Sequence, residues 1–227
     1  MALNKTEIVQ VYRRRARRYN FTAQLYYLMG FRELAYRKKA VKALSLKRGD
    51  TVVEIACGTG LNFRLFEDAV GAEGRVMGVD MTDRMLEGAR EAVREHHWDN
   101  VELTLSDATS YRFPRGVQGV ISTFAITLIP EYEDIIRNAA EALAPDGRMV
   151  ILDFKMPSGW MRRLVPLMAY LTRPFAVTLD LASRHPWEAM QKYFSQVSVQ
   201  ECFGGMVYIA SGSAPKKGER SFTPAGS

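Results

Sequence analysis

Apolar and polar residues follow two rhythms along the chain, and from residue 51 onward the two alternate. Short runs rich in β-branched residues predict strands, whereas longer segments with apolar positions three and four residues apart predict helices. The predicted strands in this part are 51–56, 75–79, 101–105, 117–123 and 148–154. The predicted helices between them are 61–70, 82–95 and 132–143. This βαβα order predicts a mostly parallel sheet with helices on both faces.

The regions on either side depart from this alternation. Residues 5–45 have apolar positions at helical spacing, with Gly30 between two helices. Residues 156–184 are apolar with interspersed arginines, and three prolines interrupt any long helix there. The tail from Ala214 is rich in Pro, Lys, Gly and Ser and is expected to be disordered. The regular elements expected before it are a helix over 186–194 and strands over 197–202 and 206–211.

These elements predict a single α/β domain over residues 1–213, because a chain of 227 residues fits one domain with its own core. Two of its segments are helical additions to the sheet. The segments expected are an N-terminal basic helical lid (1–48), a ligand-binding core (49–155), a substrate-covering helical insert (156–184), a final helix with two strands (185–213) and a flexible tail (214–227).

Cysteine content and the lack of long apolar runs bear on metal binding and on the cellular location of the protein. The chain has two cysteines and no Cys/His cluster with metal-ligand spacing, so no metal site is expected. It also lacks an apolar run of about 18 residues and a signal-peptide pattern at its start. A cytoplasmic location is therefore expected.

Basic charge is concentrated at one end. Residues 1–50 contain 13 Lys and Arg against 3 Asp and Glu, so the other 177 residues carry −4 of the net charge of +6. Residues 13–18 hold five arginines within a predicted helix. A basic helical segment over residues 5–42 binds an anionic membrane surface or nucleic acid, or it presents a solvated face. Membrane binding would place the protein peripherally on the inner face of the membrane.

A glycine-containing loop follows the first predicted strand and precedes a helix. It reads Glu54-Ile-Ala-Cys-Gly58-Thr-Gly60, and its glycines permit positive φ and close approach of a ligand to the backbone. Asp80 ends the second strand and Asp107 follows the third. Because these strand ends open onto one crevice of a doubly wound sheet, the carboxylates are suited to a ribose and an adenine amine. The three features in register predict a nucleotide-type ligand.

The loop resembles the first cofactor-binding motif of class I methyltransferases that use S-adenosyl-L-methionine (SAM), and the resemblance covers about residues 8–211. Val79-Asp80-Met81 resembles the second motif of that family, and Ser106-Asp107-Ala108 resembles its adenine-contact motif. The resemblance implies a Rossmann-like, seven-stranded, mostly parallel sheet with an antiparallel last strand, a methyl-transferring enzyme (EC 2.1.1 class) and SAM as cofactor. The cofactor-binding residues that it implies are Glu54, Ala56, Gly58, Thr59, Gly60, Asp80, Met81, Asp107, Ala108, Thr123 and Phe124.

The main rival class is the dinucleotide-dependent oxidoreductases. Their fingerprint needs a third small residue, G-x-G-x-x-G/A, and Phe63 stands at that position. A phenylalanine ring there conflicts with pyrophosphate binding and close helix–strand packing. Phe63 therefore favours SAM, which has no phosphate.

The segment 11–20 resembles the entry helix of the ubiquinone/menaquinone methyltransferases and of bacterial phospholipid N-methyltransferases. Tyr19 keeps the tyrosine of their Tyr-Asp pair, but Asn20 replaces the aspartate. The quinone enzymes continue with Met-Asn, His and Trp, and after the fifth strand they have Glu-x-Ser. The residues that stand here instead are Thr22-Ala23, Phe31, Leu34 and Asp153-Phe-Lys155. These departures count against a quinone acceptor.

The expected acceptor is a lipid amine, such as phosphatidylethanolamine or a betaine-lipid precursor, covered by the apolar insert. Tyr19, Tyr26 and Tyr208 are the candidate substrate-binding rings, because aromatic rings attract a methylated ammonium. His185 and Asp153, together with Tyr19, are the candidate catalytic residues, because an amine must lose its proton before it attacks.

Three alternatives stay open at this point. The acceptor is a quinone methylated on carbon, or it is a small soluble metabolite, or the chain is a SAM-fold protein that binds membranes without catalysis. Methylation of nucleic-acid bases is disfavoured, because Thr123-Phe-Ala-Ile126 stands where such enzymes have a motif like Asn-Pro-Pro-Tyr. We therefore expect a hydrophobic acceptor and no nucleic-acid partner.

Overall fold

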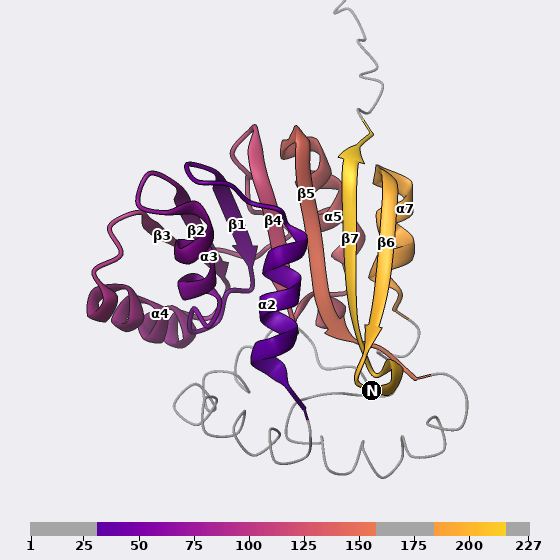
Figure 1. The fold of residues 1–227 in the computed structure, drawn as a ribbon, viewed down its shortest axis with the longest axis horizontal. Helices are drawn as coiled ribbons and strands as arrows, with labels where there is room; N and C mark the ends of the chain where they lie inside the picture. Colours follow the sequence, from indigo (N-terminus) through magenta and orange to yellow (C-terminus); the bar gives the residue numbers. More distant parts are fainter. Residues whose placement is uncertain (1–30, 158–183, 217–227) are drawn as a thin grey trace, which may run out of the picture.

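The computed structural model describes residues 31–157 and 184–216. These residues build a seven-stranded sheet with the order β3-β2-β1-β4-β5-β7-β6. The strand β7 pairs antiparallel with both of its neighbours, and the pairs among β1 to β5 are parallel. This confirms the expected Rossmann-like sheet with an antiparallel last strand (Figure 1). The strands are β1 (Thr51–Ile55), β2 (Arg75–Asp80), β3 (Val101–Leu105), β4 (Val117–Thr123), β5 (Leu143–Phe154), β6 (Phe194–Cys202) and β7 (Val207–Pro215).

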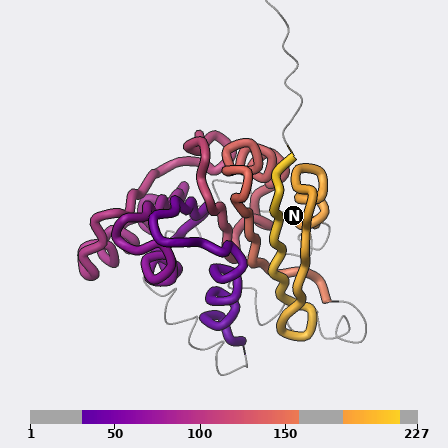
Figure 2. The backbone as a smooth tube through the Cα atoms, turned by 45° about the horizontal axis from the view of Figure 1, so that its top comes forward, coloured from indigo at the N-terminus to yellow at the C-terminus, as the bar shows by residue number. Residues whose placement is uncertain are grey.

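Helices cover both faces of this sheet. Figure 1 shows α2 and α3 on one side of the strands and α5 and α7 on the other. Figure 2 shows α4 toward one edge and the β6–β7 hairpin at the opposite edge. The α-helices in the described residues are α2 (Glu33–Ala43), α3 (Phe63–Val70), α4 (Asp83–His96), α5 (Tyr132–Ala142) and α7 (Pro186–Tyr193), with 3-10 turns η1 (Ile126–Leu128) and η5 (Phe203–Gly205).

The central strands are apolar on both faces, which explains why they are continuous hydrophobic runs in the sequence. Along β1, Val52 packs in the core cluster that contains α2 and α3, whereas Val53 packs in the cluster that contains α5 and α7. On β4, Val120 and Ile121 divide between the two clusters in the same way. Full burial of one such side chain contributes about 1.5–3 kcal/mol, so the two-sided core fixes the central strands firmly.

The strand boundaries differ from the sequence prediction at β5, which was expected to begin at residue 148. Val117 already pairs with Leu143, and the register then jumps so that Gly119 pairs with Arg148. The Pro-Asp-Gly turn expected to stop the preceding helix is thus an irregularity inside a longer strand. At the other end of the chain, β7 continues through Pro215, two residues into the predicted tail.

Several expected segments lie outside the described residues. These are most of the predicted lid and most of the predicted insert (1–30 and 158–183). The lid is represented by α2, and the expectation of a disordered tail falls on residues mostly outside the described range. Among the described residues, no helix is long and apolar enough to cross a membrane.

Candidate functional site

The loop after β1 has the backbone conformation that its glycines permit. Gly58 and Gly60 have φ angles of +58° and +80°. A Cβ atom at Gly60 would lie 2.5 Å from Cδ2 of Phe63, and a Cβ atom at Gly78 would lie 2.8 Å from Cζ of the same ring. The fully buried Phe63 ring therefore fills the space where α3 meets the loop and β2, and both glycines make room for it.

Asp80 is held in place at the end of β2 by two backbone groups. Its Oδ2 accepts a hydrogen bond from the N–H of Gly58 at 2.9 Å, and its Oδ1 accepts one from the N–H of Thr82 at 2.8 Å. Burial raises the pKa of Asp80, and the Gly58 and Thr82 N–H groups oppose this rise. Each carboxylate oxygen keeps further acceptor capacity, so Asp80 can accept hydrogen bonds from two neighbouring hydroxyls of a ligand.

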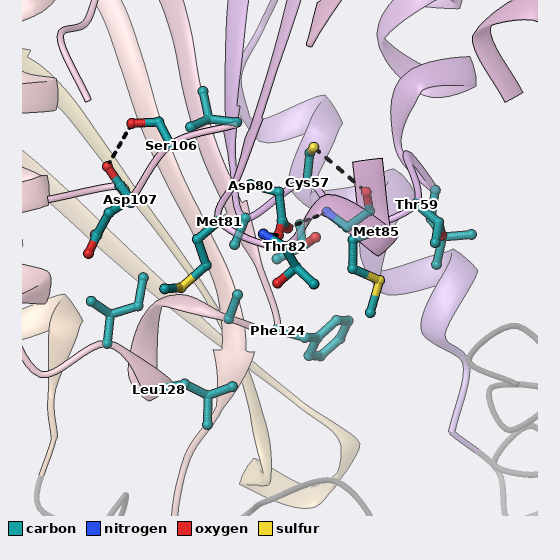
Figure 3. Close-up of a pocket in the computed structure, with 18 of the residues that line it drawn as sticks. Cys57, Thr59, Asp80, Met81, Thr82, Met85, Ser106, Asp107, Phe124 and Leu128 are labelled. Atoms are coloured by element: carbon teal, nitrogen blue, oxygen red, sulfur yellow. Dashed lines mark hydrogen bonds between the residues drawn. The ribbon is translucent and has the colours of Figure 1, made fainter. Parts of the chain in front are cut away.

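The strand ends line a cavity of about 990 Å³, a volume that includes the part open to solvent. Figure 3 shows Met81, Met85, Phe124 and Leu128 around the space beside Asp80. Asp107 borders the same cavity, and its Oδ1 accepts hydrogen bonds from the backbone N–H and hydroxyl of Thr109 at 2.9 and 2.8 Å. The cavity thus combines acidic groups at the ends of β2 and β3 with a mainly apolar wall.

A buried polar network lies where β1 and β4 end. The amide of Asn62 donates hydrogen bonds to Oε1 of Glu54 and to Oγ1 of Thr123, and the Thr123 hydroxyl lies 3.3 Å from the same Glu54 oxygen. Arg37 of α2 donates to Oγ1 of Thr123 at 2.7 Å and to Oδ1 of Asn62 at 3.3 Å. Burial raises the pKa of Glu54 to about 7, although Arg37 and the hydrogen bonds oppose this rise.

Arg37 is a site residue that the sequence analysis missed. It lines the cavity although it comes from α2, and it is 5% exposed. A signal was present, because Arg37 precedes the buried Ala40, Val41 and Leu44 by three, four and seven residues. That spacing puts all four side chains on one helix face. A charged residue on the core-facing side of a helix requires a partner in the interior.

Two residues that are not glycine have left-handed backbone angles where the sheet meets the cavity. Ala56 follows β1 with φ of +54°, and Phe124 follows β4 with φ of +55°. Both line the cavity. Such conformations are costly for residues with a Cβ atom and often occur at ligand sites, so the strain supports a functional role for this crevice.

The cavity brings together most of the predicted cofactor-binding residues. Those that line it are Ala56, Gly58, Thr59, Asp80, Met81, Asp107, Ala108, Thr123 and Phe124. Glu54 is not part of the lining but lies 3.3 Å from the hydroxyl of Thr123, which is. Gly60 is also outside the lining and packs against the ring of Phe63. Their roles toward a ligand stay predictions.

The predicted catalytic and substrate residues are placed differently. Asp153 is 3% exposed; its Oδ2 accepts from the N–H and hydroxyl of Thr127, and its Oδ1 accepts from the N–H of Phe154. Burial raises the pKa of Asp153 to about 6. These contacts make Asp153 an anchor for η1, the turn that contains the cavity residue Leu128, and a role in proton transfer stays a prediction.

His185 and Tyr208 lie on the two sides of Trp187. The ring centroids are 4.8 Å apart for His185 and Trp187 and 4.7 Å apart for Trp187 and Tyr208. The side chain of His185 is 41% exposed and is 3.2 Å from Oε1 of Glu188, whereas Tyr208 is fully buried. Neither residue lines the cavity, and Tyr19 and Tyr26 lie outside the described residues.

The donors and acceptors of the crevice fit the parts of SAM. Asp80 and Asp107 offer carboxylates suited to hydroxyls and an amine, and Met81, Met85 and Ile129 offer an apolar surface suited to a flat base. Two buried polar atoms at the loop end, Oε2 of Glu54 and Oγ1 of Thr59, have no hydrogen-bond partner among the described residues. Unpaired buried polar atoms are costly, so they indicate a polar ligand or ordered water at this end.

Comparison with known proteins gives an independent assignment. The sequence model of the family described as "Methyltransferase domain" matches residues 46–214. The demethylmenaquinone methyltransferase of Listeria welshimeri is 30% identical over 128 residues, which are 55% of this chain and 54% of that protein. The 2-phytyl-1,4-naphtoquinone methyltransferase of Thermosynechococcus vestitus is 33% identical over 123 residues, which are 54% of each chain. The chain thus spans about half the length of the curated relatives it matches.

A solved structure shows the same fold. The SAM dependent methyltransferase from Aquifex aeolicus superimposes with a TM-score of 0.58 over 78% of this chain and 88% of that one, at 20% identity.

Proposed function

The chain belongs to the methyltransferase domain family and has the class I SAM-dependent methyltransferase fold, and on that premise we propose that it transfers a methyl group from SAM to a ring carbon of a quinol. The acceptor class is an electron-rich aromatic ring with an apolar tail, such as a prenylated naphthoquinol. The observation that carries the proposal is that one cavity combines two carboxylates suited to a nucleoside, those of Asp80 and Asp107, with a mainly apolar wall.

In this proposal the cofactor is held by the residues that line the crevice. Asp80 accepts hydrogen bonds from the ribose hydroxyls, because its carboxylate is already oriented by Gly58 and Thr82. Met81 packs against the adenine, and Asp107 accepts from the adenine amine. The loop 58–60 lies against the amino-acid part.

Two observations support a quinol over the lipid amine that the sequence analysis favoured. Two curated relatives are named for quinone substrates, at 30% and 33% identity. In addition, Phe124, Leu128 and Pro130 add apolar side chains to the lining of the same cavity. Such a lining suits a ring with an isoprenoid tail better than it suits a hydrated headgroup.

The departures from the quinone enzymes at Phe31 and Leu34, just before and within α2, do not remove this apolar character. Phe31 stands where those enzymes have His, and its ring centroid lies 5.7 Å from that of Phe124, 5.8 Å from that of Phe154 and 5.6 Å from that of Phe203. Phe154 is 38% exposed and Leu34 is 58% exposed. Phe31 thus joins the cavity residue Phe124 to a cluster of aromatic rings that reaches the partly exposed Phe154.

The chemistry needs alignment and one proton acceptor. SAM supplies a methyl group on a sulfonium centre, which is already a good leaving group. The protein aligns the acceptor carbon with that methyl group, so a carbon–carbon bond forms as the carbon–sulfur bond breaks. A base then takes the proton that the ring carbon loses. Of the two described candidates, Asp153 is already enclosed by Thr127 and Phe154, whereas His185 is 41% exposed but does not line the cavity. His185 therefore stays the candidate base as a prediction that the His185→Ala variant tests.

The predicted membrane contact is part of the same proposal. Within the described part of the basic segment, α2 exposes Lys38, Lys39 and Lys42 on the side away from Arg37. An acceptor with an isoprenoid tail resides in a membrane, and exposed lysines attract anionic lipids. Peripheral association with an anionic surface is therefore the expected working location.

The test is a transfer assay with two acceptors. Purified protein receives methyl-labelled SAM together with a chemically reduced prenylated naphthoquinol and phosphatidylethanolamine in mixed vesicles. We expect label in the quinone fraction, strong loss of turnover in Asp80→Asn, and retained turnover in Asp99→Asn, which changes an exposed aspartate. Label in the lipid amine would overturn the acceptor and restore the earlier expectation, and absence of label in both would overturn the activity on apolar acceptors.

A further inference from the structure

Arg37 is the starting point of a second assignment, because a guanidinium that is 5% exposed must be compensated in the interior. Its ion pair in the described residues is with Glu33, one turn earlier on α2, and it also interacts electrostatically with the buried Glu54. Nε and Nη2 lie 2.8 and 2.7 Å from Oε1 of Glu33. Its other acceptors are neutral, since Nη1 donates to Thr123 and Asn62.

These contacts do not use all the N–H groups of the Arg37 guanidinium. A guanidinium has five N–H bonds, and the contacts in the described residues use one on Nε, two on Nη1 and one on Nη2. One N–H on Nη2 has no acceptor in the part of the chain that the structure describes, and it is left for a ligand. The ring of Phe124 lies 5.3 Å from Cζ of Arg37 and restrains the guanidinium beside the cavity.

The charges around the cavity are segregated. Asp80 and Asp107 end β2 and β3, whereas Arg37 bonds to Thr123 at the end of β4, and β1 lies between the two sides in the sheet. Among the described residues that line the cavity, Arg37 is the one Lys or Arg. Two buried oxygens have no hydrogen-bond partner among the described residues: Oε2 of Glu54, in the network that Arg37 joins through Asn62 and Thr123, and Oγ1 of Thr59, on the loop after β1.

A ligand with a nucleoside at one end and an amino acid at the other matches this segregation. If the nucleoside lies against Asp80 and Asp107, its amino-acid end lies toward β4, where a carboxylate would meet Arg37. An Arg fork binds a carboxylate with charge-assisted hydrogen bonds that a neutral residue cannot replace.

We propose that Arg37 binds the α-carboxylate of the cofactor, so that α2 is a structural part of the cofactor site. The assignment rests on the proposed function, because it needs SAM in this crevice. Glu33 orients the guanidinium when no ligand is present, and Thr123 and Phe124 position it toward the cavity. The bound cofactor then contacts both α2, through Arg37, and the residues at the ends of β1 and β4.

The test compares two ligands that differ only in the carboxylate. S-adenosylhomocysteine and S-adenosyl-3-thiopropylamine, which lacks the carboxylate, are titrated calorimetrically into the wild-type chain, Arg37→Met and Arg37→Lys. We expect Arg37→Met to weaken S-adenosylhomocysteine about 10- to 100-fold and to change the decarboxylated ligand less than about 2-fold. Arg37→Lys should fall between, because it keeps the charge without the fork. Lys38→Met, an exposed neighbour on α2, is the matched control.

The outcomes separate this proposal from the proposed function. Equal loss for both ligands in the Arg37 variants, or no loss for either, would overturn the assignment of Arg37 while leaving the SAM site intact. No binding of either ligand to the wild-type chain would overturn the SAM site itself. If Arg37→Met does not fold, the ratio of the two affinities in Arg37→Lys decides, since a purely structural role predicts the wild-type ratio.

Discussion

Replacing Glu54 with glutamine should change how the stability of the protein depends on pH. Glu54 is 1% exposed, and its Oε2 has no hydrogen-bond partner in the described residues. Burial raises its pKa from 4.5 to about 7. The folded protein therefore holds this proton more tightly than the unfolded chain does, and between these two pH values the free energy of unfolding falls as pH rises.

The size of the effect follows from the two pKa values. At about 1.4 kcal/mol for each pH unit between 4.5 and 7, ionising Glu54 in the folded state costs about 3 kcal/mol. The cost is absent below pH 4.5 and complete above pH 7. Because glutamine does not titrate, the stability of Glu54→Gln relative to wild type should rise by about 3 kcal/mol across this window.

The measurement is urea unfolding, followed by circular dichroism, at several pH values between 4.5 and 8 and constant ionic strength. Asp153 titrates in both proteins, so its contribution cancels in the difference, and of Asp80 only the part that depends on the charge of Glu54 remains. Glu91→Gln, which changes an exposed residue of α4, is the control and should show no such trend. A difference between Glu54→Gln and wild type that is independent of pH would refute the reasoning.

Three further predictions concern the loop, η1 and the proposed base. Gly60→Ala should destabilise the chain by about 2–4 kcal/mol in thermal melts, because φ is +80° there and the new methyl group would lie 2.5 Å from Phe63. Adding Phe63→Leu should recover only the part of this loss that comes from the steric clash. An unaltered melting temperature of Gly60→Ala would contradict this prediction. Thr127→Val should cost about 1–2 kcal/mol in urea unfolding, because Asp153 loses the 2.8 Å hydroxyl donor; equal stability would argue against Asp153 as the anchor of η1. His185→Ala should lower kcat with the quinol at least 10-fold while leaving S-adenosylhomocysteine binding unchanged, and full turnover would remove His185 as the base.

The sequence was sufficient for the features that depend on order along the chain. Asp80 and Asp107 could be placed on one crevice because parallel strands present their carboxyl ends at one edge. Phe63 was interpreted as incompatible with a dinucleotide fingerprint, and the structure shows its ring filling the space beneath Gly60 and Gly78.

The remaining features depend on contacts between distant segments. The contact between Arg37 and Thr123 spans 86 residues, and no local pattern encodes it, although the helix face of Arg37 was an indication. Asn62 joins Glu54 and Thr123 from a turn with no periodicity. The early start of β5 also escaped prediction, because Leu143 is added to β4 across a register jump that the Pro-Asp-Gly turn conceals.

The central claim is that the crevice at the carboxyl ends of β1 to β4 is a SAM site, and one titration tests it most directly. S-adenosylhomocysteine and NADH are each titrated into the wild-type chain and into Asp80→Asn. The account predicts one S-adenosylhomocysteine site per chain, at least 10-fold weaker in Asp80→Asn, and no saturable binding of NADH. Saturable NADH binding without S-adenosylhomocysteine binding, or equal S-adenosylhomocysteine affinity in both proteins, would contradict it.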